Sequence, residues 1–107
     1  MRILITGSDG AIGKEIVHHL STNKNYNLSL LSNKKKNRNK LKFFYQNLLK
    51  PIKLKLKPHV IIHCAAKHPN SSSGSNMRNI YFTNIKITKN LIKFANKNDV
   101  KKIFFLS

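Results

Sequence analysis

The chain has 107 residues and a formal net charge of +18, which comes from 21 Lys and Arg against three Asp and Glu. This length suffices for one domain, residues 1–107, and a hydrophobic fraction of 40% allows it only a small core. The single cysteine, Cys64, excludes an intramolecular disulfide framework, and no residues have the spacing of paired metal ligands, so we expect no metal site.

The chain opens with a predicted strand followed by a helix. Arg2–Thr6 is an aliphatic and β-branched run that ends at a glycine, which is typical of a strand buried on both faces of a parallel sheet. This run is too short for a signal peptide or a membrane span, so we expect a cytoplasmic protein. In Ala11–Leu20, one helical face collects the apolar residues Ile12, Ile16, Val17 and Leu20.

Two further strands are expected in the next part of the chain. Asn27–Ser32 predicts the second strand and Leu41–Tyr45 the third, with a basic loop over 33–40 between them. The segment Leu48–Leu56 is open to either a helix or a strand, because Pro51 can begin a helix or block one.

The second half of the chain predicts two strands around a long helix. His59–Ala65, with an apolar core, is the expected fourth strand, and a loop rich in Ser, Asn and Pro follows over 68–76. In Met77–Asn96, apolar residues recur at helical spacing at Ile80, Ile87, Leu91, Phe94 and Ala95. Lys102–Leu106 predicts the fifth strand.

Strands that alternate with helical segments imply right-handed crossovers and therefore a parallel sheet. We expect an α/β fold, namely a Rossmann-like doubly wound parallel sheet of about five strands in the order 3-2-1-4-5.

Three of the four glycines, Gly7, Gly10 and Gly13, stand at three-residue intervals between the first strand and the first helix. In such a turn the first glycine permits a tight exit from the strand, the second lets the backbone approach a pyrophosphate, and the third lets the helix pack closely. The helix N-terminus then favours an anion. A simple glycine turn is the alternative, but the order of strand, glycines and helix favours dinucleotide binding.

The glycine turn, Thr6-Gly7-Ser8-Asp9-Gly10-Ala11-Ile12-Gly13, resembles the TGxxGxxG fingerprint of the short-chain dehydrogenase/reductase superfamily. His59–Ala66 resembles the fourth strand of its extended branch, the NAD-dependent epimerase/dehydratase family, which acts mostly on nucleotide sugars. Asn84–Leu91 is similar to that family's N-x-x-x-T-x-N-L helix, and Lys102–Ser107 to its fifth strand. The resemblance spans essentially the whole chain.

This resemblance implies a site for NAD or NADP. Its implied contacts are Gly7, Gly10, Ala11, Ile12 and Gly13 at the pyrophosphate, Cys64, Ala65, Ala66 and Lys67 at the nicotinamide-side ribose, and Asn84 from the long helix. For Cys64 the alternative is a small buried apolar residue, and for Asn84 an ordinary polar helix position.

The expected second strand ends at Ser32, where an NAD site usually places an Asp or Glu that binds the ribose hydroxyls. Asn33, Lys34, Lys35 and Arg38 follow, and such residues can meet a 2′-phosphate through charge-assisted hydrogen bonds. The sequence therefore favours NADP over NAD, with an ordinary solvated basic loop as the alternative.

Gln46-Asn47-Leu48 stands where the family commonly has Gly-Asp-Leu, with the Asp accepting from the adenine amino group. Asn47 can still accept through its amide oxygen. We therefore expect Asn47 and Leu48 beside the adenine, with a weaker contact than the family's.

Short-chain dehydrogenases pair a Tyr with a Lys four residues later, and the pair moves a proton during hydride transfer. None of Tyr26, Tyr45 and Tyr81 has a Lys at that distance, so we predict no catalytic residue within the chain. The family's active Ser or Thr lies just past the position that Ser107 matches, so Ser107 is expected as a neighbour of the cofactor. His68 could face substrate in a complete enzyme.

The resulting expectation is the NAD(P)-binding N-terminal part of a nucleotide-sugar epimerase, dehydratase or reductase, which acts by hydride transfer in the full-length enzyme. Whether the chain is an enzyme by itself stays open, because the expected Tyr-x-x-x-Lys segment and substrate domain lie outside residues 1–107. The resemblance also implies a homodimer through the helix over 77–96. Apolar surface should then be exposed on that helix and beside the last strand, with marginal stability of the isolated chain.

Two other functions fit some of these observations. One is a non-catalytic module, complete as it stands, that senses NADP. The other is a basic nucleic-acid-binding module, which the high positive charge permits. The sequence disfavours nucleic-acid binding because it has no motif of interleaved aromatic and basic residues, and because the basic residues are mixed with Asn and Ile along most of the chain.

Overall fold

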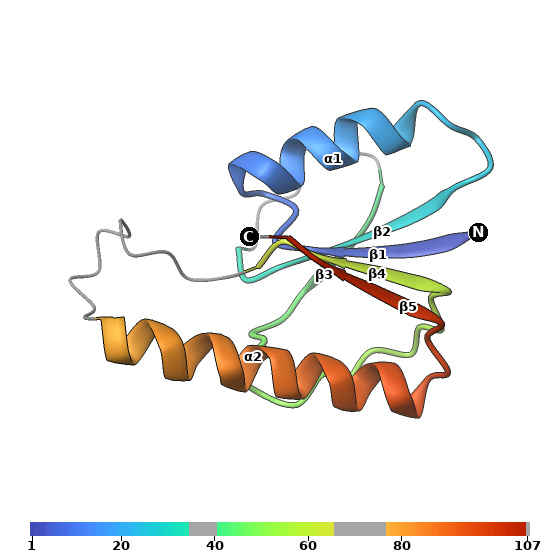
Figure 1. Cartoon of the computed structure of the whole chain (residues 1–107). Helices are drawn as coiled ribbons and strands as arrows, with labels where there is room; N and C mark the ends of the chain where they lie inside the picture. Colours follow the sequence, from blue (N-terminus) through green and yellow to red (C-terminus); the bar gives the residue numbers. More distant parts are fainter. Residues whose placement is uncertain (35–40, 66–76, 107) are drawn as a thin grey trace.

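The computed structural model of the chain describes residues 1–34, 41–65 and 77–106. They form a five-stranded parallel sheet with one helix on each side (Figure 1). The strands are β1 (Arg2–Thr6), β2 (Asn27–Ser32), β3 (Lys42–Tyr45), β4 (Val60–His63) and β5 (Lys102–Phe105), in the order β3-β2-β1-β4-β5. The predicted α/β class, strand order and parallel pairing are confirmed, and each strand lies within two residues of its predicted bounds.

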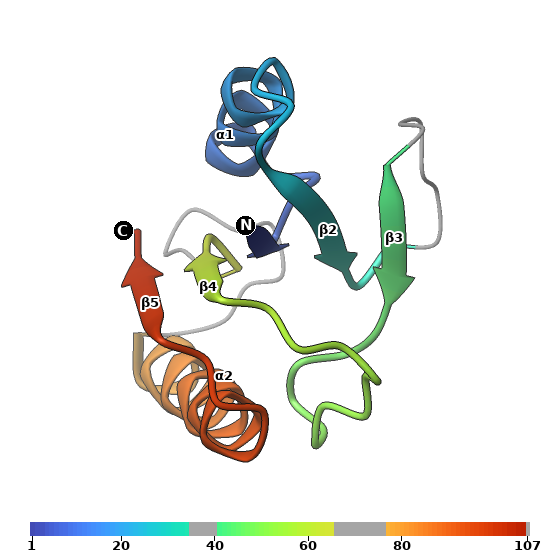
Figure 2. The same cartoon turned by 90° about the vertical axis from the view of Figure 1, so that its right-hand side faces the viewer.

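The two helices, α1 (Ala11–Ser21) and α2 (Met77–Lys97), cover opposite faces of the sheet (Figure 2). Each follows the helical spacing of apolar residues in the sequence, and α2 buries Ile80, Leu91, Phe94 and Ala95 as predicted. The helix is followed by a turn in which Asp99 adopts a left-handed φ of 56° and the Val100 N–H donates to the Ala95 carbonyl at 3.0 Å. Such a turn satisfies carbonyls that a helix end leaves unpaired.

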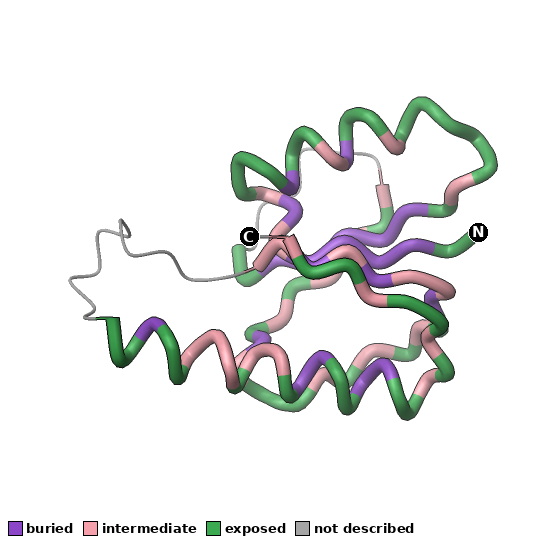
Figure 3. Tube along the Cα trace, in the orientation of Figure 1, coloured by how far each residue is buried: buried purple, intermediate pink, exposed green. Residues whose placement is uncertain are grey.

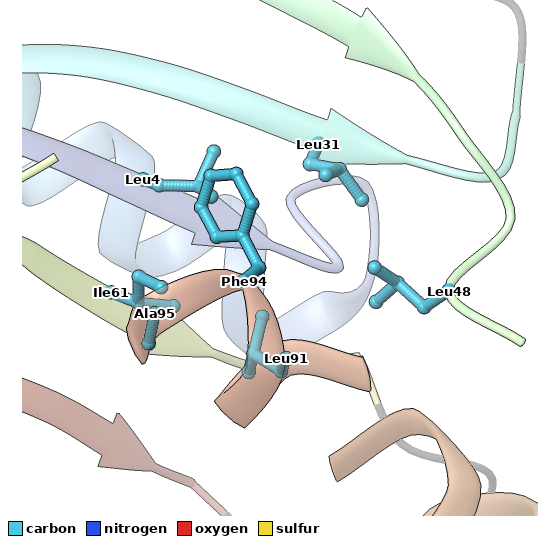
Figure 4. Close-up of a cluster of buried hydrophobic side chains, with 7 residues drawn as sticks. All are labelled: Leu4, Leu31, Leu48, Ile61, Leu91, Phe94 and Ala95. Atoms are coloured by element: carbon cyan, nitrogen blue, oxygen red, sulfur yellow. The ribbon is translucent and has the colours of Figure 1, made fainter. Parts of the chain in front are cut away.

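Alternation along the strands divides the core into two clusters. Leu4, Leu31 and Ile61 point to the face that α2 covers, where they meet Leu91 and Phe94 (Figure 4). The opposite cluster lies between the sheet and α1. It consists of Val17 from α1 and of Ile3, Ile5, Leu28 and Leu30 from the strands. Of the apolar residues expected on one face of α1, Ile12 does not join this cluster and is 46% exposed.

The connection between β3 and β4, residues 46–59, has neither a helix nor a strand. Its Ile52, Leu54 and Leu56 pack against the cluster on the α2 side of the sheet, while the intervening lysines point outward. Figure 2 shows this segment below β2 and β3, next to α2. The apolar residues of this segment alternate as in a strand because it runs extended across one face of the sheet. Every second side chain packs on the core, but the segment is not itself a strand of the described sheet.

Several apolar side chains of α2 and β5 remain outside the core (Figure 3). Tyr81 and Phe82 on α2 are 64% and 55% exposed, and Phe104 and Phe105 on β5 are 48% and 52% exposed. The predicted exposure of apolar surface at these two places is therefore confirmed. Within the described residues, no helix is long and apolar enough to cross a membrane.

Replacing Leu91 with alanine tests the packing of α2 on the sheet. Leu91 is fully buried in the α2-side cluster, so Leu91→Ala should lower the free energy of unfolding by about 2–5 kcal/mol, measured by urea denaturation. Ile92, the next residue, is 42% exposed, and Ile92→Ala should cost less than about 1 kcal/mol. Equal losses from the two substitutions would contradict this packing.

Candidate cofactor-binding site

A pocket of about 560 Å³ opens where β1, β2 and β4 end. The carboxyl ends of strands on either side of the first strand are the usual ligand site of a doubly wound sheet. The segments that line the pocket are the glycine turn, the end of β2, the start of the 46–59 connection, the residues after β4, and one face of α2. The lining residues from these segments are Gly7, Asp9, Gly10, Ala11, Ile12, Gly13, Leu31, Ser32, Asn33, Gln46, Asn47, Leu48, Leu49, Cys64, Ala65, Thr83 and Ile87.

Two of the three glycines of the turn are required by contacts within the protein. Gly7 has a φ of 66°, and a Cβ there would lie 2.6 Å from the Ala65 backbone nitrogen. At Gly13 a Cβ would overlap the carbonyl group of Gly7, because the first turn of α1 packs directly on the end of β1. These contacts match the expected roles of the first and third glycines.

Gly10 is different, because no contact among the described residues requires a glycine there. A Cβ on Gly10 would meet only the Gly7 carbonyl oxygen at 3.5 Å, an ordinary contact, and its φ of −75° suits any residue. Gly10 is also the N-cap of α1 and gives no side-chain cap, and the first turn holds no acidic residue. Ala11 and Ile12, the first residues of α1, line the pocket beside Gly10, and free backbone N–H groups at such a helix start can bind an anion.

The buried hydroxyl of Thr6 joins the glycine turn to the end of β4. Its Oγ1 lies 2.7 Å from Nδ1 of His63, and it accepts from the backbone N–H groups of Cys64 and Ala65 at 3.2 and 3.4 Å. Because the oxygen accepts twice, its single proton donates to Nδ1, which makes His63 a neutral imidazole. Burial lowers the pKa of His63 and so favours the same form.

Cys64 lines the pocket beside the glycine turn, and burial raises the pKa of its thiol. A thiol with a raised pKa is protonated at neutral pH and is a poor nucleophile. Cys64 therefore forms part of the wall of the pocket as a small, weakly polar side chain.

The wall formed by Asn47 and Leu48 is fixed by two amide side chains. Oδ1 of Asn47 accepts from the Leu49 N–H at 3.0 Å, and the buried side chain of Asn90 on α2 donates to the Leu48 carbonyl at 2.8 Å. The oxygen of Asn47 keeps a second lone pair for a ligand. Next to them, Oε1 of Gln46 is buried without a hydrogen-bond partner.

At the end of β2, the side chain of Asp9 reaches across from the glycine turn. Ser32 donates from its hydroxyl to Oδ1 of Asp9 at 2.5 Å, and Nζ of Lys34 lies 3.5 Å from Oδ2. Partial burial works to raise the pKa of Asp9, but the hydrogen bonds from Ser32 and from its own backbone, together with Lys34, hold that pKa below its ordinary value. Asp9 is thus ionised at neutral pH.

The structure places most of the predicted cofactor contacts around one pocket. Those that line it are Gly7, Gly10, Ala11, Ile12, Gly13, Ser32, Asn33, Asn47, Leu48, Cys64 and Ala65. Lys34 and Asn84 do not line the pocket. The residues of α2 that line it are Thr83 and Ile87. The predicted contacts Ala66, Lys67 and Ser107 lie outside the described residues, as does His68.

Sequence reasoning missed several lining residues, above all Asp9, Gln46, Thr83 and Ile87. Thr83 and Ile87 are one helical turn apart, and this spacing could have placed them on the face of α2 that looks toward the sheet. Asp9 occupies a variable position of the glycine fingerprint, and the fingerprint does not indicate where the side chain at such a position points.

The part of the chain that the structure describes has no group of three or more His, Cys, Asp or Glu that could hold a metal ion. Of the three tyrosines, Tyr45 and Tyr81 are exposed and none lines the pocket. The pocket can therefore bind a ligand through amides and small side chains, while its described walls offer no acid–base pair.

Comparison with known proteins agrees with this geometry. The sequence model of the "NAD dependent epimerase/dehydratase family" matches residues 3–107. A search of curated proteins found no match to the chain.

Among solved structures, a UDP-galactose 4-epimerase superposes with a TM-score of 0.83 at 24% identity, over 98% of this chain and 37% of its own. The UDP-glucose 4-epimerase of Thermotoga maritima, solved with UDP-glucose, gives 0.78 at 26% identity over 98% and 37%. The Bordetella bronchiseptica enzyme WbmG, in complex with NAD and UDP, gives 0.73 at 21% identity over 98% and 36%. The chain thus spans little more than a third of the length of these structures.

Substituting the second and third glycines separately distinguishes ligand contact from internal packing. Gly10→Ala should change the free energy of unfolding by less than about 1 kcal/mol, because its Cβ meets no close neighbour, yet it should weaken dinucleotide binding at least about tenfold. Gly13→Ala should destabilise the fold by about 3 kcal/mol or more, because its Cβ overlaps backbone. Urea denaturation and titration calorimetry measure the two effects. A Gly10→Ala protein with unchanged affinity would contradict this assignment.

The neutral His63 predicts a loss of stability in mild acid. Burial lowers its pKa in the folded chain, so the associated stability is fully present above the unfolded-state pKa of about 6.5 and is lost as pH falls through the folded value. Urea denaturation from about pH 7 to pH 5 should show a smaller loss for His63→Asn than for the wild type, since asparagine can accept from Thr6 but does not titrate. His19→Asn is the matched comparison, at a histidine of α1 whose side chain is 77% exposed. A slope that disappears in His19→Asn and persists in His63→Asn would contradict the prediction.

Proposed function

The chain belongs to the NAD dependent epimerase/dehydratase family, and we propose that residues 1–107 are the NAD(P)-binding part of an enzyme that acts on a nucleotide sugar. The observation that carries this proposal is Gly10, a glycine that the protein's own packing does not require, placed at the open start of α1. A close approach of ligand to the backbone explains a glycine at such a position.

The described residues fit a dinucleotide along the length of the pocket. The amides at Gly10, Ala11 and Ile12 would hold the pyrophosphate, and Asn47 with Leu48 would bound the adenine. Cys64 and Ala65 would lie at the nicotinamide-side ribose, with Ala66, Lys67 and Ser107 as further proposed contacts. The predicted contact of Asn84 stays a prediction.

A bound nicotinamide supplies the acceptor or donor of a hydride. The residues of this chain bind and orient it, because the end of β4 is fixed against the glycine turn through Thr6 and His63. The similar structures include a UDP-galactose 4-epimerase, an epimerase solved with UDP-glucose and an enzyme in complex with NAD and UDP, which supports a nucleotide sugar as substrate. Epimerisation, dehydration and reduction all use hydride transfer of this kind, and the Tyr-x-x-x-Lys pair and the sugar-binding domain would lie outside residues 1–107.

A homodimer through α2 belongs to the same proposal. Its support is the exposed apolar surface of the helix, where Met77, Tyr81, Phe82 and Ile92 are 42–65% exposed. An exposed apolar surface of this kind is typical of an interface. Neither an NADP-sensing module nor a nucleic-acid-binding module gains support from the family match or the structural similarities.

Titration calorimetry with NAD and NADP tests the proposed function. We expect saturable binding of one dinucleotide per chain, and a rise in melting temperature that corresponds to about 2.7 kcal/mol when the ligand is present at a hundred times its Kd. A short oligonucleotide should not displace the dinucleotide, although the chain carries a net charge of +18. A folded protein that binds neither dinucleotide would overturn the proposal.

A further inference from the structure

We infer that Asp9, from the glycine turn, supplies the carboxylate that binds the adenosine ribose and makes this pocket select NAD over NADP. The inference rests on the proposed function and concerns the same pocket. It reverses the preference for NADP that the sequence favoured. That preference depended on the absence of a carboxylate at Ser32 and on the basic residues that follow it, of which Lys35 and Arg38 lie outside the described residues.

The position of Asp9 is the first reason. Asp9 and Ser32 are 23 residues apart in the sequence, yet their side chains lie 2.5 Å apart at the end of β2. This is the place where dinucleotide-binding folds usually have an Asp or Glu for the ribose hydroxyls. Asp9 lines the pocket, and the other two carboxylates of the chain, Glu15 and Asp99, do not.

The hydrogen bonds of Ser32 and Asp9 are the second reason. The Ser32 hydroxyl donates to Asp9 and accepts from the Lys34 backbone N–H at 3.1 Å, so its proton is not available to a ligand. Ribose hydroxyls need an acceptor, and a carboxylate has about four lone-pair sites. Ser32, Lys34 and the backbone N–H of Asp9 take up to three of these sites, so a lone pair of the carboxylate remains to accept from a ribose hydroxyl.

The side chain of Asp9 is held in place more firmly than that of Lys34, and this difference favours NAD over NADP. Asp9 is 28% exposed and is fixed by the buried Ser32, whereas the Lys34 side chain is 75% exposed and approaches the carboxylate only to 3.5 Å. An exposed pair of this kind contributes little. Among the described residues, a 2′-phosphate at the ribose would therefore meet the fixed negative charge of Asp9 and the exposed ammonium of Lys34, while the 2′-hydroxyl of NAD would gain a charge-assisted hydrogen bond to Asp9.

The measured quantity that tests this inference is the ratio of the Kd for NADP to the Kd for NAD. Calorimetry is carried out at about 0.15 M salt, because the general positive charge of the chain attracts the additional phosphate of NADP at low salt. For the wild type we expect a ratio of at least about ten, and for Asp9→Asn a ratio at least about tenfold lower, which corresponds to the loss of one charge-assisted hydrogen bond.

Three further variants control the result. Glu15→Gln removes a carboxylate on the exposed side of α1, where Glu15 is 76% exposed, and should leave the ratio within about twofold. Lys34→Gln should also leave the ratio within about threefold, since the inference gives Lys34 no direct part in selection. The double variant Asp9→Asn with Ser32→Asp moves the carboxylate from the glycine turn to the end of β2, and it should restore the preference for NAD. Circular dichroism establishes that each variant is folded, and Asp9→Ser replaces Asp9→Asn if the latter is not.

Separate outcomes overturn the inference and the proposed function. A wild type that binds NADP as tightly as NAD, an Asp9→Asn ratio within threefold of the wild type, or a selective loss of NADP binding in Lys34→Gln would overturn the inference while dinucleotide binding stands. An equal change in Glu15→Gln would overturn it as well, because the effect would then come from net charge. A folded wild type that binds neither cofactor would instead overturn the proposed function.

Discussion

The close backbone contact between the end of β1 and the first turn of α1 is the constraint on which the rest of the structure depends. Gly13 has no room for a Cβ against Gly7, and Gly7 itself packs in a left-handed conformation on the backbone after β4. Three chain segments therefore meet without intervening side chains. This contact places the start of α1 at the pocket, and it leaves Gly10 as the one glycine of the turn whose Cβ position is open.

The sheet positions a binding site although few helices pack on it. Only α1 and α2 cover the described sheet, and an irregular connection takes the remaining place on the α2 side. The connection is nevertheless held in place, because Asn90 of α2 donates to the Leu48 carbonyl and Leu48 belongs to the core. A buried amide thus fixes the wall of the pocket at Leu48, where the structure has no helix to do so.

The fold was predictable from the sequence because each strand and helix has its own period of apolar residues, as in the buried run of β1 and the spacing of Leu91, Phe94 and Ala95 in α2. The geometry of the glycine turn beside the pocket was predictable because Gly7 and Gly13 stand where a positive φ and a close backbone contact require glycine. Whether residues 48–56 form a helix or a strand could not be decided from the sequence. Leu54 and Leu56 alternate because they pack on a face of the sheet, and a strand at the edge of the sheet would show the same alternation. Asp9 was missed because its direction is set by Ser32, a contact between residues far apart in the sequence.

The Thr6 hydroxyl, with its bonds to His63 and to the two amides after β4, has an evolutionary consequence. Loss of His63 removes one partner of the Thr6 hydroxyl, whereas loss of that hydroxyl also removes the acceptor of the Ala65 N–H. Among descendants of this sequence, position 6 should therefore change less often than position 63. Replacements at position 6 should keep a hydroxyl, as serine does.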